Sequence, residues 1–219
     1  IHFPVKGVIW YQGEANVGRA AEYTDLFQSL IQDWRDKWQN PKMPFYFVQL
    51  ASYLERKEIQ PNSEWAALRE AQSKALHLCN TGMAVAIDIG DANDIHPKNK
   101  QEVARRLSLL ALQKTYGKGN VTDIMSYRDY VVEKGIVRLI FKGNTKGFQP
   151  SDLLTGFTIA GADHVFYPAK VEIKGDELLV WSPDVSNPVA VRYGWADNPD
   201  CNLYDRTGLP VAPFRTDCW

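Results

Sequence analysis

The chain has 219 residues, of which 45% are hydrophobic, and its 25 Lys and Arg residues nearly balance its 26 Asp and Glu residues. This length is enough to bury a sizeable core, in one large domain or two small ones. The balanced charge and the lack of a long apolar run argue against binding to nucleic acid, association with an anionic membrane and a membrane-spanning segment, so we expect a neutral or small partner.

The first part of the chain, to about Gly117, alternates strand and helix patterns. Apolar residues recur at helical spacing in segments 23–38 and 103–111, and more weakly in 65–76. Asn99 and Glu102 form a start for the last of these helices that resembles a capping box. Three short runs are apolar at consecutive positions, as strands buried on both faces should be: Val5–Tyr11, Phe45–Leu50 and Met83–Asp88. The alternation predicts an α/β fold with a parallel sheet and helices on both faces.

The pattern changes after Lys118 to short strands divided by glycine turns. Val131–Phe141 and Val171–Trp181 each indicate a β-hairpin with Lys-Gly or Gly-Asp at its tip. We therefore predict two parts, residues 1–118 in the α/β domain and residues 119–219 in an antiparallel β-rich region packed on it. The linker Gly117-Lys-Gly119 is too brief to let the two parts move freely.

Polar side chains follow two of the predicted strands. The first strand runs without a break into Gln12, Gly13, Glu14 and Asn16, and the third is followed by the segment Asp91–Pro97. Ligands of open α/β sheets bind beyond the carboxyl ends of the strands, so these segments predict a functional site at that edge.

The segments Trp-Tyr-Gln-Gly-Glu and Asp-Ile-His-Pro resemble the sialate O-acetylesterase family, a branch of the SGNH hydrolases that removes acetyl groups from sugars. Similar stretches cover nearly the whole chain: Trp65–Gln72, Phe157–Gly161, Phe166–Ala169 and Val191–Trp195. The resemblance implies part of an SGNH-hydrolase (flavodoxin-like) three-layer domain followed by an antiparallel β-rich region. It also implies ester hydrolysis through an acyl-serine without a cofactor, on an acetylated sugar, in a secreted or periplasmic protein.

The family's nucleophilic serine stands in an early Gly-Gln-Ser-Asn segment, which these 219 residues lack. The resemblance therefore implies the C-terminal portion of an esterase, whose serine comes from an upstream segment or a second chain of the same protein. Because Ile1 is not an initiator methionine, we expect the natural N-terminus to lie elsewhere. Alone, the chain is expected not to hydrolyse acetyl esters.

His96 matches the segment in which the family places its general base. A lone histidine is more often a surface residue, but the Asp-Ile-His-Pro-Lys-Asn-Lys context favours the catalytic role. SGNH enzymes commonly have an aspartate three residues before this histidine, and here Asn93 stands there. The nearest carboxylate is Asp94; a main-chain carbonyl could orient the ring instead, and Asp91 and Asp88 remain alternatives. Asn93 itself is kept as a residue that supports the site.

The resemblance places part of the oxyanion hole at Gln12 and Gly13, where an amide or a backbone N–H can face the developing negative oxygen. The alternative is a Gln-Gly turn that only ends a strand. Asn16 is expected to support this site. Glu14, a carboxylate near aromatic residues, should be paired, and we expect its partner to be Arg69.

Other residues carry weaker signals. Lys98 and Lys100 could steer a sugar carboxylate, although a solvated basic loop is the simpler interpretation. Four aromatic residues could stack on a sugar, but such residues more often belong to the core: Trp10, Tyr11, Trp65 and Trp195. His77 and His164 are interpreted as structural, and no pair of His or Cys has the spacing of metal ligands. Cys79 is expected to be buried, whereas Cys201 and Cys218 could pair in an oxidising compartment.

Two alternatives to a sialate esterase stay open. One keeps the chemistry but takes acetylated xylan or another polysaccharide as substrate. The other is a non-catalytic carbohydrate-binding or structural unit that keeps the esterase scaffold without its nucleophile.

Overall fold

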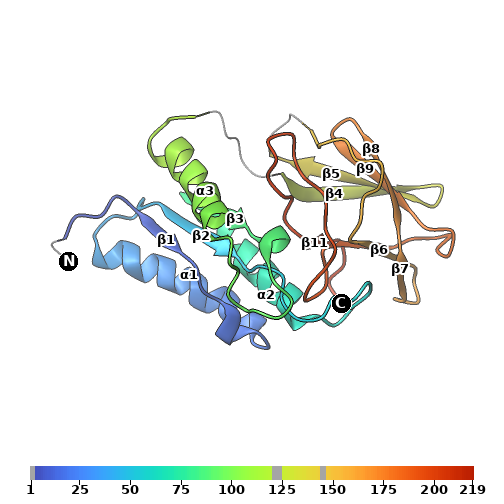
Figure 1. Cartoon of the computed structure of the whole chain (residues 1–219), viewed down its shortest axis with the longest axis horizontal. Coiled ribbons are helices and arrows are strands. Elements are labelled where there is room, and N and C mark those ends of the chain that lie inside the picture. The colour runs from blue at the N-terminus through green and yellow to red at the C-terminus, as the bar shows by residue number, and fades with distance from the viewer. Residues whose placement is uncertain (1–2, 120–124, 144–146) are drawn as a thin grey trace.

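Three parallel strands form the centre of the N-terminal half in the computed structural model, which describes residues 3–119, 125–143 and 147–219 (Figure 1). The strands are β1 (Val8–Trp10), β2 (Phe45–Gln49) and β3 (Thr81–Val85), in the spatial order β1-β2-β3. The predicted parallel sheet is therefore confirmed. The first strand is shorter at both ends than its apolar run, and the third begins two residues earlier and ends three residues earlier than predicted.

Alternate residues of the central strand β2 face opposite layers of helices. Phe45 and Phe47 pack with the aromatic residues of α1 (Ala20–Lys37) and with α2 (Glu64–Ser73), whereas Tyr46 and Val48 pack against α3 (Lys100–Leu110). Both faces of the strand are thus buried, which explains why Phe45–Val48 is hydrophobic at consecutive positions instead of alternating. This three-layer arrangement confirms the α/β fold class.

The helices begin at polar caps. The Ser63 side chain accepts a hydrogen bond from the N–H of Ala66 at the start of α2, and Asn99 does the same for the N–H of Glu102 at the start of α3. The Glu102 carboxylate contacts Arg105 and Arg106, so only half of the expected capping box forms. Short 3₁₀ helices lie at Glu14–Asn16, Lys74–His77 and Ile87–Ile89, and a π-helical turn at Ala111–Thr115 extends α3.

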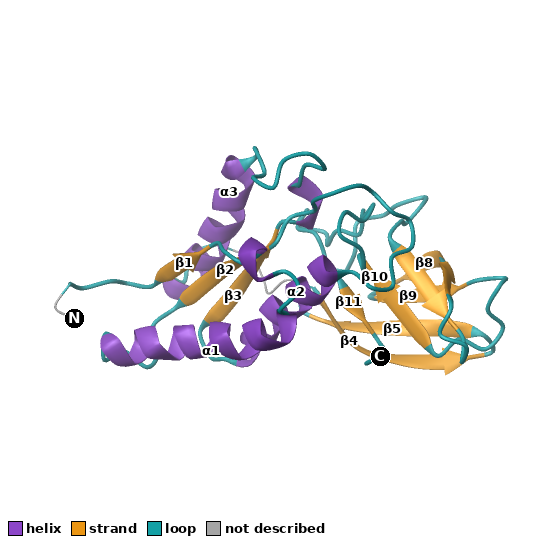
Figure 2. Ribbon diagram, turned by 90° about the horizontal axis from the view of Figure 1, so that it is seen from below, coloured by secondary structure: helices purple, strands orange, loops and turns teal. Residues whose placement is uncertain are grey.

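Two four-stranded antiparallel sheets form the C-terminal half (Figure 2). Both predicted hairpins are present, with turns at Lys134-Gly135 and Gly175-Asp176. A core of apolar side chains from both sheets, including Leu139, Ile159 and Leu178, lies between them. One sheet has the order β4-β5-β9-β8: Ser126–Glu133, Ile136–Lys142, Glu177–Trp181 and Lys170–Lys174. The other has the order β11-β10-β6-β7: Phe214–Arg215, Ala190–Tyr193, Phe157–Ala160 and Phe166–Pro168.

Arg69 joins the two halves. Its fully buried guanidinium donates to the carbonyls of Leu50 and Ala51 in the α/β half and to those of Ala196 and Asp197 in the β-rich half. Because late segments of the chain are bonded into the first half in this way, the domain boundary at residue 118 stays a prediction.

The cysteines differ from expectation at one position. Cys79, predicted to be buried, is exposed, because it lies in the turn between the 3₁₀ helix Lys74–His77 and β3, outside the apolar face of α2. Cys201 and Cys218 are free thiols in this structure. Within the described residues, no helix is both long and apolar enough to cross a membrane.

Candidate active site

The chain just after β1 and the start of α3 lie close together at the carboxyl edge of the sheet. Tyr11, just after β1, and Ile95, in the loop after β3, both pack against the core cluster on the α1–α2 face of the sheet. The Lys100 ammonium, at the start of α3, lies 5.3 Å from the centre of the Tyr11 ring. This contact joins residues that flank the two segments singled out in the sequence; that Gln12–Asn16 and Asp91–Pro97 form one site stays a prediction.

Hydrogen bonds fix the Gln12–Asn16 turn. The Gln12 side-chain amide donates to Asn16 Oδ1 over 2.8 Å, and the Gln12 carbonyl accepts from the Tyr23 hydroxyl and the Gln72 amide, both at 3.1 Å. Gly13 is buried with a φ of 156°, and a Cβ there would lie 3.0 Å from Gln72 Nε2. Glycine at this position lets the backbone approach the Gln72 side chain closely.

The proposed pair of Glu14 and Arg69 is wrong. Arg69 donates to four backbone carbonyls, and in the described part of the chain Glu14 has no ion pair. The face of α2 that carries Arg69 is turned toward Leu50 and Ala51, just after β2, and toward Ala196 and Asp197. A sequence pattern cannot show this direction. Burial and the nearby charge of Glu14 raise the pKa of Tyr11 to about 12, so the phenol stays protonated at neutral pH.

Gln72 is a site residue that the sequence reasoning missed. Besides its bond to the Gln12 carbonyl, its side chain accepts from the backbone N–H of Leu50 over 2.9 Å, so one buried amide ties the ends of β1 and β2 together. A signal was available: Arg69 and Gln72 stand at helical spacing on the buried face of α2, where a polar residue needs partners.

The His96 loop is held by carboxylates at its own backbone. Asp91 Oδ1 accepts from the N–H of Asn93 over 3.0 Å, and Asp94 Oδ1 accepts from the N–H of His96 over 2.9 Å. The hydrogen bond from Asn93, with the nearby Lys98 ammonium, lowers the pKa of Asp91. These two turns set the direction of the segment that carries His96.

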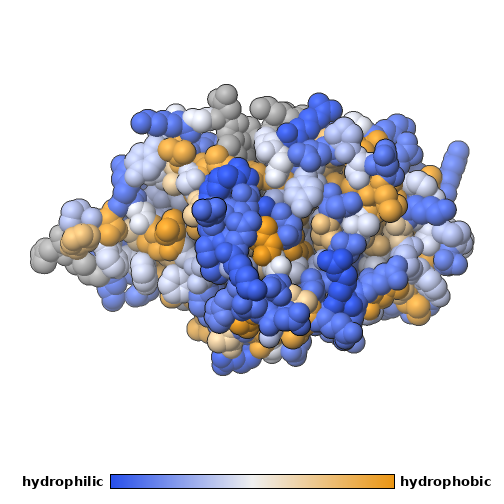
Figure 3. Space-filling model, in the orientation of Figure 1, coloured by the Kyte–Doolittle hydropathy of each residue, from blue (hydrophilic) through white to orange (hydrophobic). Residues whose placement is uncertain are grey.

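Asp94 also faces the His96 ring, but not within hydrogen-bonding distance. Its Oδ1 lies 3.6 Å from His96 Nδ1, and the two side chains are 38% and 84% exposed, respectively. The contact leaves Nε2 as the ring nitrogen directed away from Asp94. On the side of the molecule seen in Figure 1, a band of hydrophilic side chains runs through the middle, with apolar side chains on either side of it (Figure 3).

Asp88 is bound elsewhere. Its two oxygens accept from Arg106 over 2.6 and 2.7 Å, and Arg106 also donates to the Val85 carbonyl and to Glu102. This ion pair is nearly buried, so Asp88 is not the acid that orients His96 in this structure. Arg106 was missed by the sequence reasoning, although its position on the inner face of α3, four residues after Glu102, is visible there. It fixes the end of β3 and the first turn after it.

Three of the four candidate stacking aromatics are used elsewhere. Trp10 packs against Trp34 and Phe45, the Trp65 indole donates to the Ala51 carbonyl, and Trp195 contacts two guanidinium groups. Tyr11 alone borders the polar edge. His77 contacts the Lys74 carbonyl and His164 stacks on Trp219, so both are engaged away from the site. The described residues contain no group of three His, Cys, Asp or Glu side chains that could hold a metal.

Comparisons with known proteins point to one family. A family model described as carbohydrate esterase, sialic acid-specific acetylesterase, matches residues 2–111. Sialate O-acetylesterases from Mus musculus and Homo sapiens are each 30% identical to this chain, covering 96% of it and 44% and 45% of their own lengths. The solved structure of a carbohydrate acetylesterase from Xanthomonas citri superimposes with a TM-score of 0.93 and 46% identity, over 99% of this chain and 51% of that one. The chain thus spans about half the length of the relatives it matches.

Proposed function

The chain belongs to the carbohydrate esterase family of sialic acid-specific acetylesterases, and on that premise we propose that it is the histidine-bearing part of an enzyme that hydrolyses O-acetyl esters on sugars. The observation that carries the proposal is the contact of Tyr11, just before the Gln12–Asn16 turn, with Lys100, four residues after His96, beyond the carboxyl ends of two strands of one parallel sheet. This edge is where an open α/β sheet binds its ligands.

The nucleophile in this proposal is a serine upstream of residue 1, or on a second chain of the same protein. Two observations support it. The relatives are about twice as long as this chain, and among the described strands β1 pairs only with β2. Ile9, in the middle of that edge strand, is 68% exposed, which is unusual for a large apolar side chain in a sheet. A further parallel strand beside β1 would cover it and bring its own carboxyl end to the same edge of the sheet as the Gln12–Asn16 turn.

His96 acts as the general base. Its Nδ1 faces Asp94, so Nε2 takes the proton from the serine hydroxyl as the serine oxygen attacks the acetyl carbonyl. The tetrahedral intermediate then collapses as His96 returns the proton to the sugar oxygen, which leaves as an alcohol. Water attacks the acetyl-serine in the same way, releases acetate and restores the serine.

The Gln12–Asn16 turn supplies part of the oxyanion hole in this mechanism. The Gln12 amide already donates to Asn16, and the turn is tied down by Tyr23 and Gln72, so its backbone N–H groups are held in fixed directions. Preorganised donors of this kind stabilise a developing oxyanion because they need no rearrangement during the reaction. Gly13, without a side chain, lets this turn pack closely against Gln72 and Leu50, which helps to fix it.

The substrate to test first is O-acetylated sialic acid, because the mammalian relatives are named for it. The Xanthomonas relative, with higher identity, is named only a carbohydrate acetylesterase, so acetylated xylan is the second substrate to test. The proposal includes secretion or export to the periplasm, where glycans of other cells are encountered; fractionation of the native host would test it.

The proposal is tested by replacing His96 with Ala in the full-length protein. We expect kcat on p-nitrophenyl acetate to fall about 10³-fold or more, with the fold unchanged, because a general base is lost. His77→Ala is the matched control, since His77 is also exposed but contacts the Lys74 carbonyl and lies at the other end of β3. Near-normal turnover of the His96 variant, or equal losses in both variants, would contradict the assignment and favour a non-catalytic unit.

A further inference from the structure

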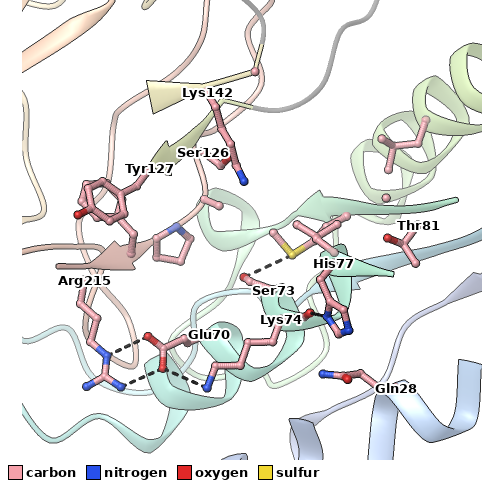
Figure 4. A pocket seen from close by; sticks show the side chains of 18 of the residues that line it. Gln28, Glu70, Ser73, Lys74, His77, Thr81, Ser126, Tyr127, Lys142 and Arg215 are labelled. Atoms are coloured by element: carbon pink, nitrogen blue, oxygen red, sulfur yellow. Dashed lines mark hydrogen bonds and ion pairs between the residues drawn. The ribbon is translucent and has the colours of Figure 1, made fainter. Parts of the chain in front are cut away.

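A cleft of about 940 Å³ opens between the two halves of the molecule, along the outer edge of β3. Figure 4 shows its walls, which come from α1, α2 and the following turn on one side and from β4, β5 and β11 on the other. Thr81 and Gly82, which line it, lie at the start of β3, whereas His96 follows the end of that strand. The cleft is therefore separate from the candidate active site.

Positively charged groups dominate the polar lining of this cleft. Among the described lining residues, Glu70 is the only carboxylate, and it is already engaged: Arg215 contacts its two oxygens over 2.8 and 3.0 Å, and the Lys74 ammonium lies 4.0 Å away. One carboxylate thus faces two cations, and Lys114 and Lys142 also line the cleft. The described lining carries a net positive charge.

Lys142 is the cation best placed to bind a ligand. Figure 4 shows its side chain reaching from β5 into the cleft, toward the side where Ser73 and His77 lie. Lys142 is exposed, and within residues 3–119, 125–143 and 147–219 no hydrogen bond or ion pair joins its ammonium group to another side chain or carbonyl. An ammonium that enters a concave site without a carboxylate partner is suited to bind an anionic group of a ligand.

The rest of the lining fits a sugar. Tyr127 forms one wall, held flat by stacking on Phe214 with ring centres 4.8 Å apart and planes 11° apart. Gln28 and Ser126 add side chains that can hydrogen-bond to hydroxyl groups, whereas the Ser73 hydroxyl already donates to the Arg69 carbonyl and accepts from the Gln49 amide. A cleft that combines a fixed aromatic face, neutral polar groups and an unpaired cation matches a polar ring with one negative charge.

We propose that this cleft is a second sugar-binding site, which takes a carboxylate-bearing sugar with its carboxylate at Lys142. The proposal goes beyond ester hydrolysis, because it needs neither His96 nor a serine. Two kinds of glycan share this chemistry: those with sialic acid and those with uronic acids. Such a site would hold an acidic glycan beside the enzyme while acetyl groups are removed at the other edge of the sheet.

Isothermal titration calorimetry on the full-length protein tests the proposal, with N-acetylneuraminic acid and glucuronic acid as ligands and with glucose and acetate as controls. We expect at least one acidic sugar to bind, neither control to bind comparably, and binding to weaken with added salt. Lys142→Gln should weaken it about tenfold, which is the loss of one charge-assisted contact. Lys174→Gln, a change at an exposed lysine on β8, should leave it unchanged.

The two acidic sugars distinguish the possible sources of the ligand. Binding of N-acetylneuraminic acid alone would indicate sialylated glycans, and binding of glucuronic acid alone would indicate acidic polysaccharides. Three results would overturn the proposal: no acidic sugar binds, Lys142→Gln changes nothing, or acetate binds equally well. Turnover of p-nitrophenyl acetate should be unchanged in Lys142→Gln, so failure of this site and failure of the esterase proposal give different results.

Discussion

Asp94→Asn separates a catalytic triad from a dyad, and the structure gives the size of the expected effect. Asp94 Oδ1 lies 3.6 Å from His96 Nδ1; the His96 side chain is largely open to water and that of Asp94 is partly so. Two unit charges at about this distance attract each other by about 1 kcal/mol in water, and by about 4 kcal/mol where the surroundings are much less polar. The exposure of the pair selects the smaller value, so loss of the charge should lower kcat about fivefold.

Asparagine is the appropriate replacement because Asp94 also holds the backbone. Its Oδ1 accepts the N–H of His96 over 2.9 Å, and an asparagine oxygen can accept the same bond. Asp94→Ala removes both the charge and the acceptor, so we expect a larger loss than with asparagine, from misplacement of the loop. The assay is kcat and KM for p-nitrophenyl acetate with the full-length protein, at the pH of maximal rate. Asp91→Asn, which changes the neighbouring turn without facing the ring, is the control.

A loss of 10³-fold or more in Asp94→Asn would refute this reasoning. It would show that the carboxylate contacts His96 directly in the complete enzyme, in surroundings from which water is excluded. A loss of a few-fold would leave the histidine oriented mainly by its backbone turn, as a dyad.

Two further predictions concern the framework that carries the site. Arg69→Met should lower the free energy of unfolding by about 3 kcal/mol or more, because four charge-assisted hydrogen bonds to carbonyls in a buried place are lost. Arg56→Met, at an exposed ion pair with Asp200, should change it by less than about 1 kcal/mol. Urea denaturation measures both variants, and equal effects would contradict the role of Arg69 in joining the two halves. Hydrogen bonds from Arg105, with the charge of Arg106, lower the pKa of Glu102 to about 2. The Glu102 carboxylate therefore stabilises the fold fully above its ordinary pKa of about 4.5, and this contribution is lost as the pH falls from there toward 2. Glu102→Gln should reduce the loss of stability over that pH range by about 1 kcal/mol. An unchanged dependence of stability on pH would show that the ion pair contributes nothing.

The strands and helices could be predicted because local patterns determine them. Phe45–Val48 is hydrophobic at every position, and such a run is typical of a strand that is covered on both faces. Asn99 caps α3 as its position before Glu102 indicates, and the two glycine turns made the hairpins visible. The exact ends of β1 and β3 were less predictable, because Asp88 leaves the strand direction to meet Arg106 on α3.

One contact at the carboxyl edge could be predicted from the topology, but the internal contacts of the candidate site could not. Segments that follow parallel strands share that edge of the sheet, and Tyr11 contacts Lys100 there. Which partner a buried side chain selects depends on packing between distant segments. Arg69 was expected at Glu14 and instead contacts Ala196 and Asp197, more than a hundred residues later in the chain. The cleft at Lys142 is beyond sequence reasoning for the same reason.

Covalent labelling of the full-length protein with a fluorophosphonate tests the central claim most directly, namely that His96 of this chain activates a serine supplied from outside it. The account predicts that mass spectrometry finds the label on a serine outside residues 1–219, and that His96→Ala slows labelling about 10³-fold. A label on a serine within these residues, or an unchanged labelling rate in the His96 variant, would contradict it.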